Sequence, residues 1–312
     1  MEYSGCNLCG SNDFVLIYSI PDHLLGHKDP LYQFVRCQKC GLVYQNPRPT
    51  IEEITKFYPD HYESYQIPQP RSWFLRNAYQ YGLKKRAKFV LKHKKSGKLL
   101  DIGCGPGLFL HEMNKYGGWE PFGVEISPYA ADIARNQFGL SVFCGTLEQA
   151  NFPDNYFDAI TMWDVLEHLH DPSFTLKEIN RILKPDGIIV IRVPNLDSLD
   201  AKFFGKYWAG WDAPRHLFVF GKKSLKALLN KCGFSAVGFS SRSGGYPTFL
   251  LSLRFWLEGI GLDTSNLIRR VVELLYHPVV RVLTAPLFFI PTLWQLGPLL
   301  VVVAQKGEAL RR

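Results

Sequence analysis

The sequence predicts an α/β fold in which helices cover both faces of a mostly parallel β-sheet. From residue 98 onward, short apolar runs alternate with longer segments of helical spacing, which is typical of a parallel sheet. A glycine-rich loop joins the first apolar run to the first of these helical segments. The chain has 312 residues, of which 46% are hydrophobic, and this is enough for one substantial core with a small additional module.

Seven apolar runs are expected to form the strands of this sheet. They comprise residues 98–103, 121–126, 141–146, 157–165, 188–194, 234–240 and 299–306. Helices are expected between them, at residues 108–117, 129–139, 173–187 (with its closing turn) and 224–233. Gly233 ends the last of these helices, because glycine readily adopts the left-handed conformation found after a helix.

The composition indicates an ordered protein, and its basic charge leaves open both an anionic partner and none. A net charge of +8 favours nucleic acid, a phosphate-bearing substrate or an acidic membrane surface, without choosing among them. Aromatic residues make up 14% of the chain, which argues against bulk disorder. The first residues lack the apolar stretch of a signal peptide, so we expect a cytoplasmic protein.

Two C-x-x-C pairs lie near the N-terminus, Cys6 with Cys9 and Cys37 with Cys40. Each pair forms a tight turn that presents two thiolates, and two such turns complete a closed tetrahedral Zn²⁺ site of the structural type. A glycine directly follows the second cysteine of each pair, as such a turn favours. Disulfide bonds or a redox-active pair are the alternatives, and an unexported chain favours the metal.

The loop from Asp101 to Gly107 reads Asp-Ile-Gly-Cys-Gly-Pro-Gly and opens a helix. Glycines permit a tight turn and the close approach of a ligand to the backbone. The dinucleotide fingerprint G-x-G-x-x-G is not met, because residue 108 is leucine, and the lysine of a P-loop is missing. Glu125 ends the second predicted strand, where a carboxylate accepts both hydroxyls of a ribose. The ligand is therefore expected to carry a ribose but need not carry a diphosphate.

The chain resembles the class I S-adenosylmethionine (SAM)-dependent methyltransferases in four stretches. These are LLDIGCGPGLFL, PFGVEIS, NFPDNYFDAITMWDVLEHLHDP and EINRILKPDGIIVIRVPN, in the order and spacing of that family. The resemblance implies a Rossmann-like methyltransferase fold with a mostly parallel seven-stranded sheet and SAM as cofactor. It also implies roles by position: the cofactor-binding residues would be Asp101, Gly103, Cys104, Gly105, Gly107, Glu125, Ile126, Thr146, Leu147 and Trp163.

Within this set the implied roles differ. Asp101 and the backbone of the glycine loop would hold the methionine part of SAM, and Glu125 would hold the ribose hydroxyls. Ile126 would pack on the adenine, and Trp163 would line the pocket. Thr146 and Leu147 would lie at the adenine edge, where the family often has aspartate in place of Thr146.

A cysteine module joined to such a core resembles a group of bacterial methyltransferases with N-terminal zinc-binding segments. The segments CNLCG, RCQKCGLVYQNPRPT and APRHLFVF carry this resemblance. It implies a sugar, glycan or lipid-linked acceptor. The sugar C-methyltransferases with a similar module carry a much larger C-terminal domain, which this chain lacks.

The chain is thus expected to divide into five segments. Residues 1–66 form a zinc-ribbon module and residues 67–97 a linker helix. Residues 98–244 form the SAM-binding core, to which residues 298–306 add a last strand. Residues 245–297 form a hydrophobic helical insertion near the C-terminus.

The insertion is rich in Leu, Phe, Trp and Pro. The stretch Val282–Gln305 carries no charge and is long enough to span a bilayer, but three prolines interrupt it. We expect a helical segment that rests on the inner face of the membrane, where its arginines would suit the surface. A hydrophobic lid or the face of a homodimer is the equal alternative.

The residues for catalysis are expected beyond the fourth and fifth strands, because ligands bind at the carboxyl ends of a parallel sheet. His216 is the favoured base or substrate ligand, with Arg215 holding an anion, and His168 is a further candidate. Asp164, Glu167 and His168 also resemble the E-x-x-E-H metal site of ubiquinone-pathway O-methyltransferases, with aspartate in place of the first glutamate.

Three functions remain open. The leading hypothesis is a SAM-dependent methyltransferase acting on a sugar, glycan or lipid-linked acceptor. An RNA methyltransferase whose zinc ribbon grips nucleic acid is the second, but the basic residues are spread along the chain rather than gathered in one patch. A non-catalytic zinc-ribbon adaptor is the third.

Overall fold

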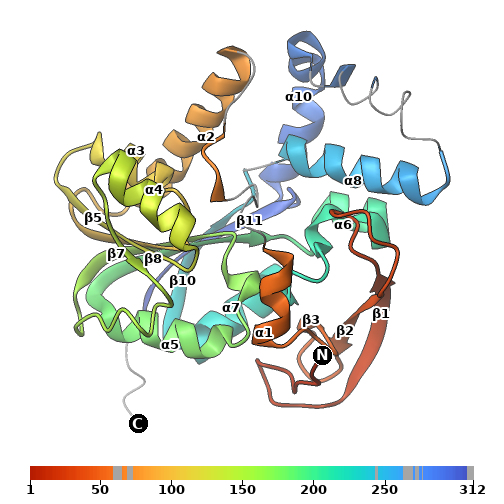
Figure 1. Ribbon diagram of the computed structural model, residues 1–312, viewed down its shortest axis with the longest axis horizontal. Helices are drawn as coiled ribbons and strands as arrows, with labels where there is room; N and C mark the ends of the chain where they lie inside the picture. Colours follow the sequence, from red (N-terminus) through yellow and green to blue (C-terminus); the bar gives the residue numbers. More distant parts are fainter. Residues whose placement is uncertain are drawn as a thin grey trace. The chain divides into compact units, whose positions relative to one another are not determined.

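The computed structural model describes residues 1–58, 65–68, 73–242, 245–262, 270, 274, 275 and 277–307. The chain forms two compact units (Figure 1). Unit 1 contains residues 1–54, 193–225 and 239–301, and unit 2 contains residues 55–192, 226–238 and 302–312.

A seven-stranded sheet has the order β10-β11-β8-β7-β4-β5-β6. Its strands are β4 (Gly97–Ile102), β5 (Trp119–Glu125), β6 (Ser141–Cys144), β7 (Phe157–Trp163), β8 (Leu183–Pro194), β10 (Phe234–Ser240) and β11 (Leu299–Lys306). The pairs β4–β5, β4–β7, β5–β6 and β7–β8 are parallel. The prediction of a mostly parallel seven-stranded sheet is therefore confirmed, and β8 begins five residues before the expected start.

The early start of β8 has a tertiary cause. Leu183 pairs with Phe157 of β7, so the strand continues through residues that read locally as a turn. Lys184 Nζ then lies 2.9 Å from both carboxylate oxygens of Asp158. The preceding helix ends at Ile182 rather than in the predicted turn.

Helices cover both faces of the sheet in unit 2, with α3 and α4 on one side and α5 on the other (Figure 1). They are α2 (Trp73–Leu91), α3 (Leu108–Asn114), α4 (Pro128–Phe138) and α5 (Pro172–Ile182). Local sequence sets their ends. The Ser127 hydroxyl accepts a hydrogen bond from the Ala130 amide at the start of α4, and Gly139 ends that helix in the left-handed conformation. Asp171 caps α5 in the same way.

Unit 1 contains a second sheet, with the order β1-β2-β3-β9. Its strands are β1 (Phe14–Ile20), β2 (Tyr32–Cys37), β3 (Val43–Gln45) and β9 (Phe218–Val219), and all neighbours are antiparallel. Strand β9 is distant from β3 in the sequence but pairs with it. The cysteine-containing segment and residues 218–219 therefore share one sheet.

Unit 1 also contains the helices α1 (Ile51–Ile54), α6 (Leu199–Phe204), α8 (Gly245–Gly259) and α10 (Pro278–Leu293), and α7 (Lys222–Lys231) begins in it. Aromatic contacts join them: the Phe249 ring centroid lies 5.3 Å from that of Phe204 and 5.2 Å from that of Phe288. In the part of the chain that the structure describes, no helix is both long and apolar enough to cross a bilayer.

Candidate active site

The glycine loop follows β4 and leads into α3. Gly103, Gly105 and Gly107 all have positive φ angles, of 66°, 53° and 80°. A Cβ atom on Gly103 would lie 2.6 Å from Val165 Cγ2, and one on Gly107 would lie 2.5 Å from Leu140 Cδ1. Glycine is thus required at both positions by conformation and by space.

Glu125 lies at the carboxyl end of β5 and is 4% exposed. Its Oε2 accepts a hydrogen bond from the Gly105 amide at 2.7 Å, and its Oε1 accepts one from the Ser127 amide at 2.9 Å. Burial raises the pKa of Glu125, and these amide hydrogen bonds oppose the rise. Each oxygen has a further lone pair, so the carboxylate is held in place and can still accept hydroxyl donors.

Asp101, near the end of β4, is 3% exposed. The Thr161 hydroxyl donates a hydrogen bond of 2.5 Å to Asp101 Oδ1. Burial raises the pKa of Asp101 to about 7, although the Thr161 hydrogen bond and the cations of Arg86 and Arg192 lower it. The group therefore titrates near neutral pH, which is a common property of residues in functional sites.

The expected adenine side contains one exposed and one buried residue. Ile126 is 66% exposed, although it directly follows a buried strand, whereas Leu147 is buried. Thr146 takes part in a local turn, in which its hydroxyl accepts from the Gln149 amide at 3.4 Å and its own amide donates to Gln149 Oε1 at 2.9 Å. Cys104 is buried, and its Sγ lies 3.7 Å from the Gly105 carbonyl oxygen.

Trp163 ends β7 and is 7% exposed. The Arg86 and Arg192 guanidinium carbons lie 5.4 Å and 5.7 Å from its ring centroid, and the Phe109 ring packs edge-on at 5.3 Å. Its buried Nε1 has no hydrogen-bond partner among the described residues. A buried donor without a partner indicates a place for a ligand or water.

Three residues near this site were missed in the sequence: Tyr65, Arg86 and Arg192. Burial raises the pKa of Tyr65 to about 12, and the nearby charge of Glu125 adds to the rise. Arg192 Nε lies 2.8 Å from Asp164 Oδ1, and its Nη2 contacts the other carboxylate oxygen. One signal was available for Arg86, because it adjoins the buried stripe formed by Leu83, Ala87 and Val90 on α2.

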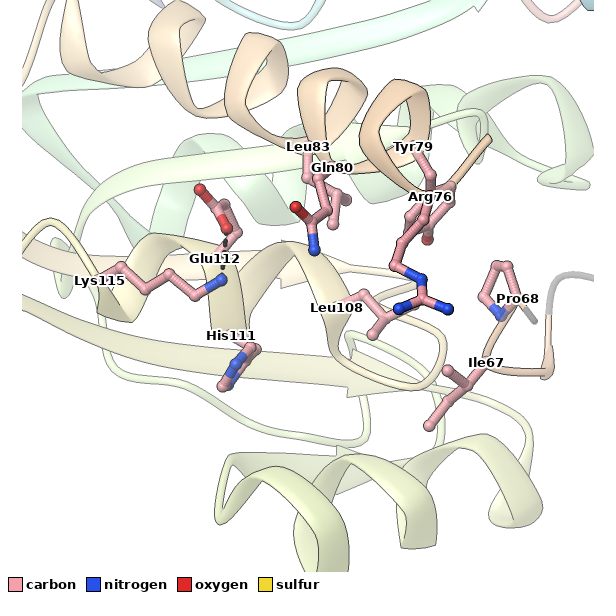
Figure 2. Close-up of a pocket in the computed structure, with 10 residues that line it drawn as sticks. All are labelled: Ile67, Pro68, Arg76, Tyr79, Gln80, Leu83, Leu108, His111, Glu112 and Lys115. Carbon is pink, nitrogen blue, oxygen red and sulfur yellow. Dashed lines mark hydrogen bonds and ion pairs between the residues drawn. The ribbon is translucent and has the colours of Figure 1, made fainter. Parts of the chain in front are cut away.

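A cavity of about 660 Å³ lies between α2 and α3 (Figure 2). Its lining residues are Ile67, Pro68, Arg76, Tyr79, Gln80, Leu83, Leu108, His111, Glu112 and Lys115. Figure 2 shows the Arg76 side chain reaching from α2 toward Leu108, the residue after the glycine loop. Lys115 Nζ is paired with Glu112 at 2.7 Å and faces the same cavity.

The two histidines proposed for catalysis lie in different units. In unit 2, His168 Nδ1 lies 2.8 Å from the Tyr58 hydroxyl oxygen. In unit 1, His216 is buried, and its Nδ1 lies 2.9 Å from the Gly210 carbonyl oxygen. Because a carbonyl oxygen only accepts, Nδ1 of His216 carries a proton, and its Nε2 lies 3.8 Å from Asp212 Oδ2.

The surroundings of Arg215 differ from those that we expected for a residue that binds a substrate anion. It is fully buried in unit 1, and its Nη2 lies 2.9 Å from Asp22 Oδ1 and 2.7 Å from Asp212 Oδ1. Burial alone would lower the pKa of Arg215, but the two carboxylates outweigh it and raise the pKa. Two carboxylates of the chain thus take the place of the substrate anion that we expected.

The four cysteines of the predicted zinc site come together. Cys6 Sγ lies 3.4 Å from Cys40 Sγ, and Cys9 Sγ lies 3.5 Å from Cys37 Sγ. All four sulfur atoms are within 4.8 Å of one another. Tetrahedral Zn²⁺ with bonds of about 2.3 Å separates its sulfur ligands by about 3.8 Å, so the arrangement fits this ion.

The second metal hypothesis is supported for two of its three residues. Glu167 and His168 belong to a group of potential metal ligands, whereas Asp164 belongs to none among the described residues and forms an ion pair with Arg192. Its carboxylate is therefore engaged by a cation of the chain, which makes it a poor ligand for a second cation.

Comparisons of this chain with known proteins agree with the fold and with the glycine loop described above. The "Methyltransferase domain" family model matches residues 74–237. An uncharacterised methyltransferase of Schizosaccharomyces pombe is 34% identical over 124 residues, which are 35% of this chain and 45% of the relative's length. A demethylmenaquinone methyltransferase of Staphylococcus saprophyticus is 29% identical over 55% of this chain and 84% of its own length. A ubiquinone biosynthesis O-methyltransferase of Actinobacillus pleuropneumoniae is 28% identical over 52% and 74%.

Solved structures resemble the fold at low sequence identity. The [4+2]-cyclase SpnF has a TM-score of 0.52 and 18% identity, covering 84% of this chain and 98% of its own. A chain from the complex of the Haloferax volcanii Trm112 methyltransferase activator with a methyltransferase has a TM-score of 0.50 and 16% identity, covering 76% and 93%. The family match extends over more than half of the chain and includes the glycine loop and Glu125. The chain therefore belongs to the methyltransferase domain family and is a SAM-dependent methyltransferase.

Proposed function

We propose that unit 2 binds SAM along the glycine loop and that the enzyme methylates a lipid-linked small-molecule acceptor. The observation that carries the cofactor assignment is the geometry of Glu125. Both of its carboxylate oxygens are fixed by backbone amides of the loop and of the residue after β5, and both keep a lone pair for the ribose hydroxyls. Exposed Ile126 would then pack on the adenine.

Two observations support a lipid-linked acceptor over a free sugar or a glycan. Two relatives are named for methylation steps on quinones, which are amphipathic small molecules. In addition, α10 exposes an apolar stripe at helical spacing. It consists of Val279, Leu283, Leu287 and Ile290, and Trp294 continues it at the C-cap position. Such a stripe suits the surface of a membrane, where a lipid-linked acceptor would be found.

We extend this to the membrane contact of unit 1. Residues 274–307 contain no Asp or Glu, and the guanidinium of Arg281 lies 5.0 Å from the Tyr246 ring centroid. An apolar helix that carries a cation and no acidic residue is attracted to anionic lipid. Residues 263–269 belong to the insertion that we expected to contact the membrane, but they lie outside the described residues.

SAM supplies a methyl group on a positively charged sulfur. Transfer to an oxygen acceptor breaks the sulfur–carbon bond and forms a carbon–oxygen bond, and the acceptor proton must pass to a base. We assign this proton to one of the two histidines, since the Gly210 carbonyl orients His216 and the Tyr58 hydroxyl orients His168. The four cysteines would hold Zn²⁺ in a structural role, and Arg215 would stabilise unit 1.

The cofactor assignment is tested by calorimetric titration of the zinc-replete protein with SAM and with S-adenosylhomocysteine. Glu125→Gln should weaken binding about 10- to 100-fold, because it removes the charge from hydrogen bonds to two hydroxyls. Glu120→Gln, an exposed glutamate on the same strand, is the matched control. Equal affinity of both variants and the parent would contradict the ribose assignment.

The acceptor class is tested by methyl transfer from labelled SAM to extracted membrane lipids, compared with soluble glycans and RNA. Label in the lipid fraction that is lost on Glu125→Gln supports the proposal. Label found only in glycan or in RNA would replace the lipid-linked acceptor by that class.

A further inference from the structure

The cavity between α2 and α3 lies within unit 2, and none of the described residues that line it is one that we assign to the cofactor (Figure 2). Its volume of about 660 Å³ is within the range of sites for small molecules. Half of its lining residues are polar or charged, and the other half are apolar or aromatic. A ligand that fits this lining therefore has both a polar and an apolar part.

Arg76 is a cation of this cavity without a bonded anion. It is exposed on α2, and it forms no hydrogen bond and no ion pair with any described residue. In Figure 2 its side chain reaches from α2 toward Leu108, which also lines the cavity. A guanidinium presents five donors in a planar fork, so Arg76 retains its full capacity to bind an anion.

The carboxylate that lines the cavity is already paired. Glu112 is 3% exposed, and its Oε2 accepts a hydrogen bond of 2.7 Å from Lys115 Nζ. Its Oε1 accepts a second one of 3.4 Å from the Tyr116 hydroxyl. Helix α2 itself contains no Asp or Glu. Two cations, Arg76 and Lys115, thus line the cavity with one carboxylate, and the lining keeps an excess of positive charge.

The number of donors favours a phosphate ester over a carboxylate as the anion. Besides Arg76, the side chains of Gln80 and Lys115 line the cavity, and that of Gln80 forms no hydrogen bond with a described residue. The Lys115 ammonium has three donors, and its bond to Glu112 uses one of them. The three terminal oxygens of a phosphate ester can accept from all of these groups, whereas a carboxylate has only two oxygens.

The apolar half of the lining suits a hydrocarbon chain attached to that phosphate. Leu83 of α2 and Leu108 of α3 line the cavity, together with Ile67 and Pro68 from the segment before α2. Apolar side chains of this kind bind a ligand by removing its apolar surface from water. A phosphate without a hydrocarbon chain would make no use of them.

The first residue of α2 indicates a membrane as the source of the ligand. Trp73 is 75% exposed and precedes Arg76 by three positions, so both residues lie on one side of the helix. Tryptophan is enriched at the interface between membrane and water, because its ring is apolar and its N–H group is polar. The cation that would bind a phosphate therefore lies beside a side chain suited to a lipid surface.

We propose that the cavity between α2 and α3 binds the phosphate ester of a lipid-linked acceptor, with Arg76 as the main anion-binding residue. Gln80 and Lys115 donate to the remaining oxygens, and the apolar side chains contact the first part of the lipid chain. The inference rests on the proposed lipid-linked acceptor and adds the class of its headgroup. A soluble phosphate ester has the same chemistry, and the experiment distinguishes the two sources.

The probes are n-octyl phosphate, glycerol 3-phosphate, which lacks the apolar chain, and n-octyl-β-glucoside, which lacks the charge. Each is titrated by calorimetry, below the concentration at which it forms micelles, into the full-length, zinc-replete parent, Arg76→Ala and Arg76→Lys. Lys88→Ala is the matched control, because Lys88 is an exposed cation on the same helix that does not line the cavity. S-adenosylhomocysteine is titrated into each protein to measure cofactor binding separately.

We expect the parent to bind octyl phosphate at least about tenfold more tightly than either other probe, since only octyl phosphate matches both halves of the lining. Arg76→Ala should weaken octyl phosphate about 10- to 100-fold, and Arg76→Lys should restore part of the loss. Lys88→Ala should stay within about twofold of the parent. The affinity for S-adenosylhomocysteine should be the same in all four proteins.

Three results would overturn the inference. Equal affinity of the parent and Arg76→Ala for octyl phosphate would remove the anion site, and equal binding of octyl glucoside would leave only an apolar groove. Equal binding of glycerol 3-phosphate would replace the lipid by a soluble phosphate ester. If the parent bound octyl phosphate as expected but no S-adenosylhomocysteine, the proposed cofactor would fail while the phosphate site would stand.

Discussion

Unit 1 and unit 2 each contain a buried or half-buried arginine near carboxylates, and the two arginines differ in how their charge is balanced. Arg215 of unit 1 is fully buried and bonded to Asp22 and Asp212. Arg86 of unit 2 stacks on Trp163 and has neither a hydrogen bond nor an ion pair among the described residues. The charge of Arg215 is thus balanced by two bonded carboxylates, whereas that of Arg86 has no bonded anion among the described residues.

The same contrast extends to the groups around the arginines. The four sulfur atoms in unit 1 form a closed set suited to one metal ion. In unit 2, the Trp163 indole donor has no partner among the described residues, and the pKa of Asp101 is raised to about 7. Unit 1 also contains buried polar atoms without a hydrogen-bond partner, such as Trp208 Nε1. The indole donor of Trp163 differs in that it lies beside the glycine loop, where we propose that the cofactor binds.

The largest effect on stability is expected from removing one thiolate of the four-cysteine cluster in unit 1. Cys37→Ser should remove Zn²⁺ and unfold the cysteine-containing segment of unit 1, because a structural zinc site contributes much of the folding free energy of a small module. Zinc content by elemental analysis and thermal unfolding measure this. Cys144→Ser, a thiol outside the cluster, should retain one zinc ion per chain. An unchanged zinc content in Cys37→Ser would refute the assignment.

The next effect compares the two arginines directly. Arg215→Ala should lower the free energy of unfolding by about 3–5 kcal/mol, since it leaves the buried Asp22 and the partly buried Asp212 without their cation. Arg86→Ala should lower it much less, because no ion pair is lost. Urea denaturation at neutral pH measures both. Equal destabilisation would remove the distinction between an arginine held by ion pairs and one without them.

Whether a feature of these two units could be predicted from the sequence depends on how far apart in the chain the contacting residues lie. The strands and the glycine loop were predictable, because apolar runs and glycines with positive φ are local features. The two cysteine pairs were also predictable, since each pair is a local turn. The partner of Arg215 was not, because Asp22 lies 193 positions away in the chain. Arg86 could not be singled out in the sequence, because Lys84, Lys85 and Lys88 lie beside it. Only its position next to the buried face of α2 distinguishes it from these lysines.

A smaller effect concerns pH. The raised pKa of Asp101, about 7, means that its carboxylate becomes charged as the pH rises through neutrality. Affinity for S-adenosylhomocysteine should therefore rise, up to about tenfold, between about pH 6 and pH 7.5, below the range in which a ligand α-amino group loses its proton. Asp101→Asn should have lower affinity and a flat profile. A rise that persists in Asp101→Asn would assign the titration to another group.

Asp101 also links pH to the stability of the ligand-free protein. Its pKa is raised in the folded state, so the native state binds more protons than the unfolded state between about pH 4 and pH 7. Stability due to this group must therefore fall as the pH rises across that window. Asp101→Asn should be more stable than the parent above pH 7 and should lose this advantage near pH 4, as denaturation at several pH values would show.

The smallest effect is expected at Thr146, which lies at the proposed adenine edge. Its hydroxyl is already used in the turn with Gln149, where it accepts from a backbone amide. Thr146→Ala should therefore cost about 0.5–1 kcal/mol of stability, as a lost cap does, and change cofactor affinity less than about threefold. Calorimetry with S-adenosylhomocysteine separates this from the larger loss in Glu125→Gln. If Thr146→Ala weakened binding as strongly as Glu125→Gln, the hydroxyl would contact the cofactor, and the turn with Gln149 would have to open on binding.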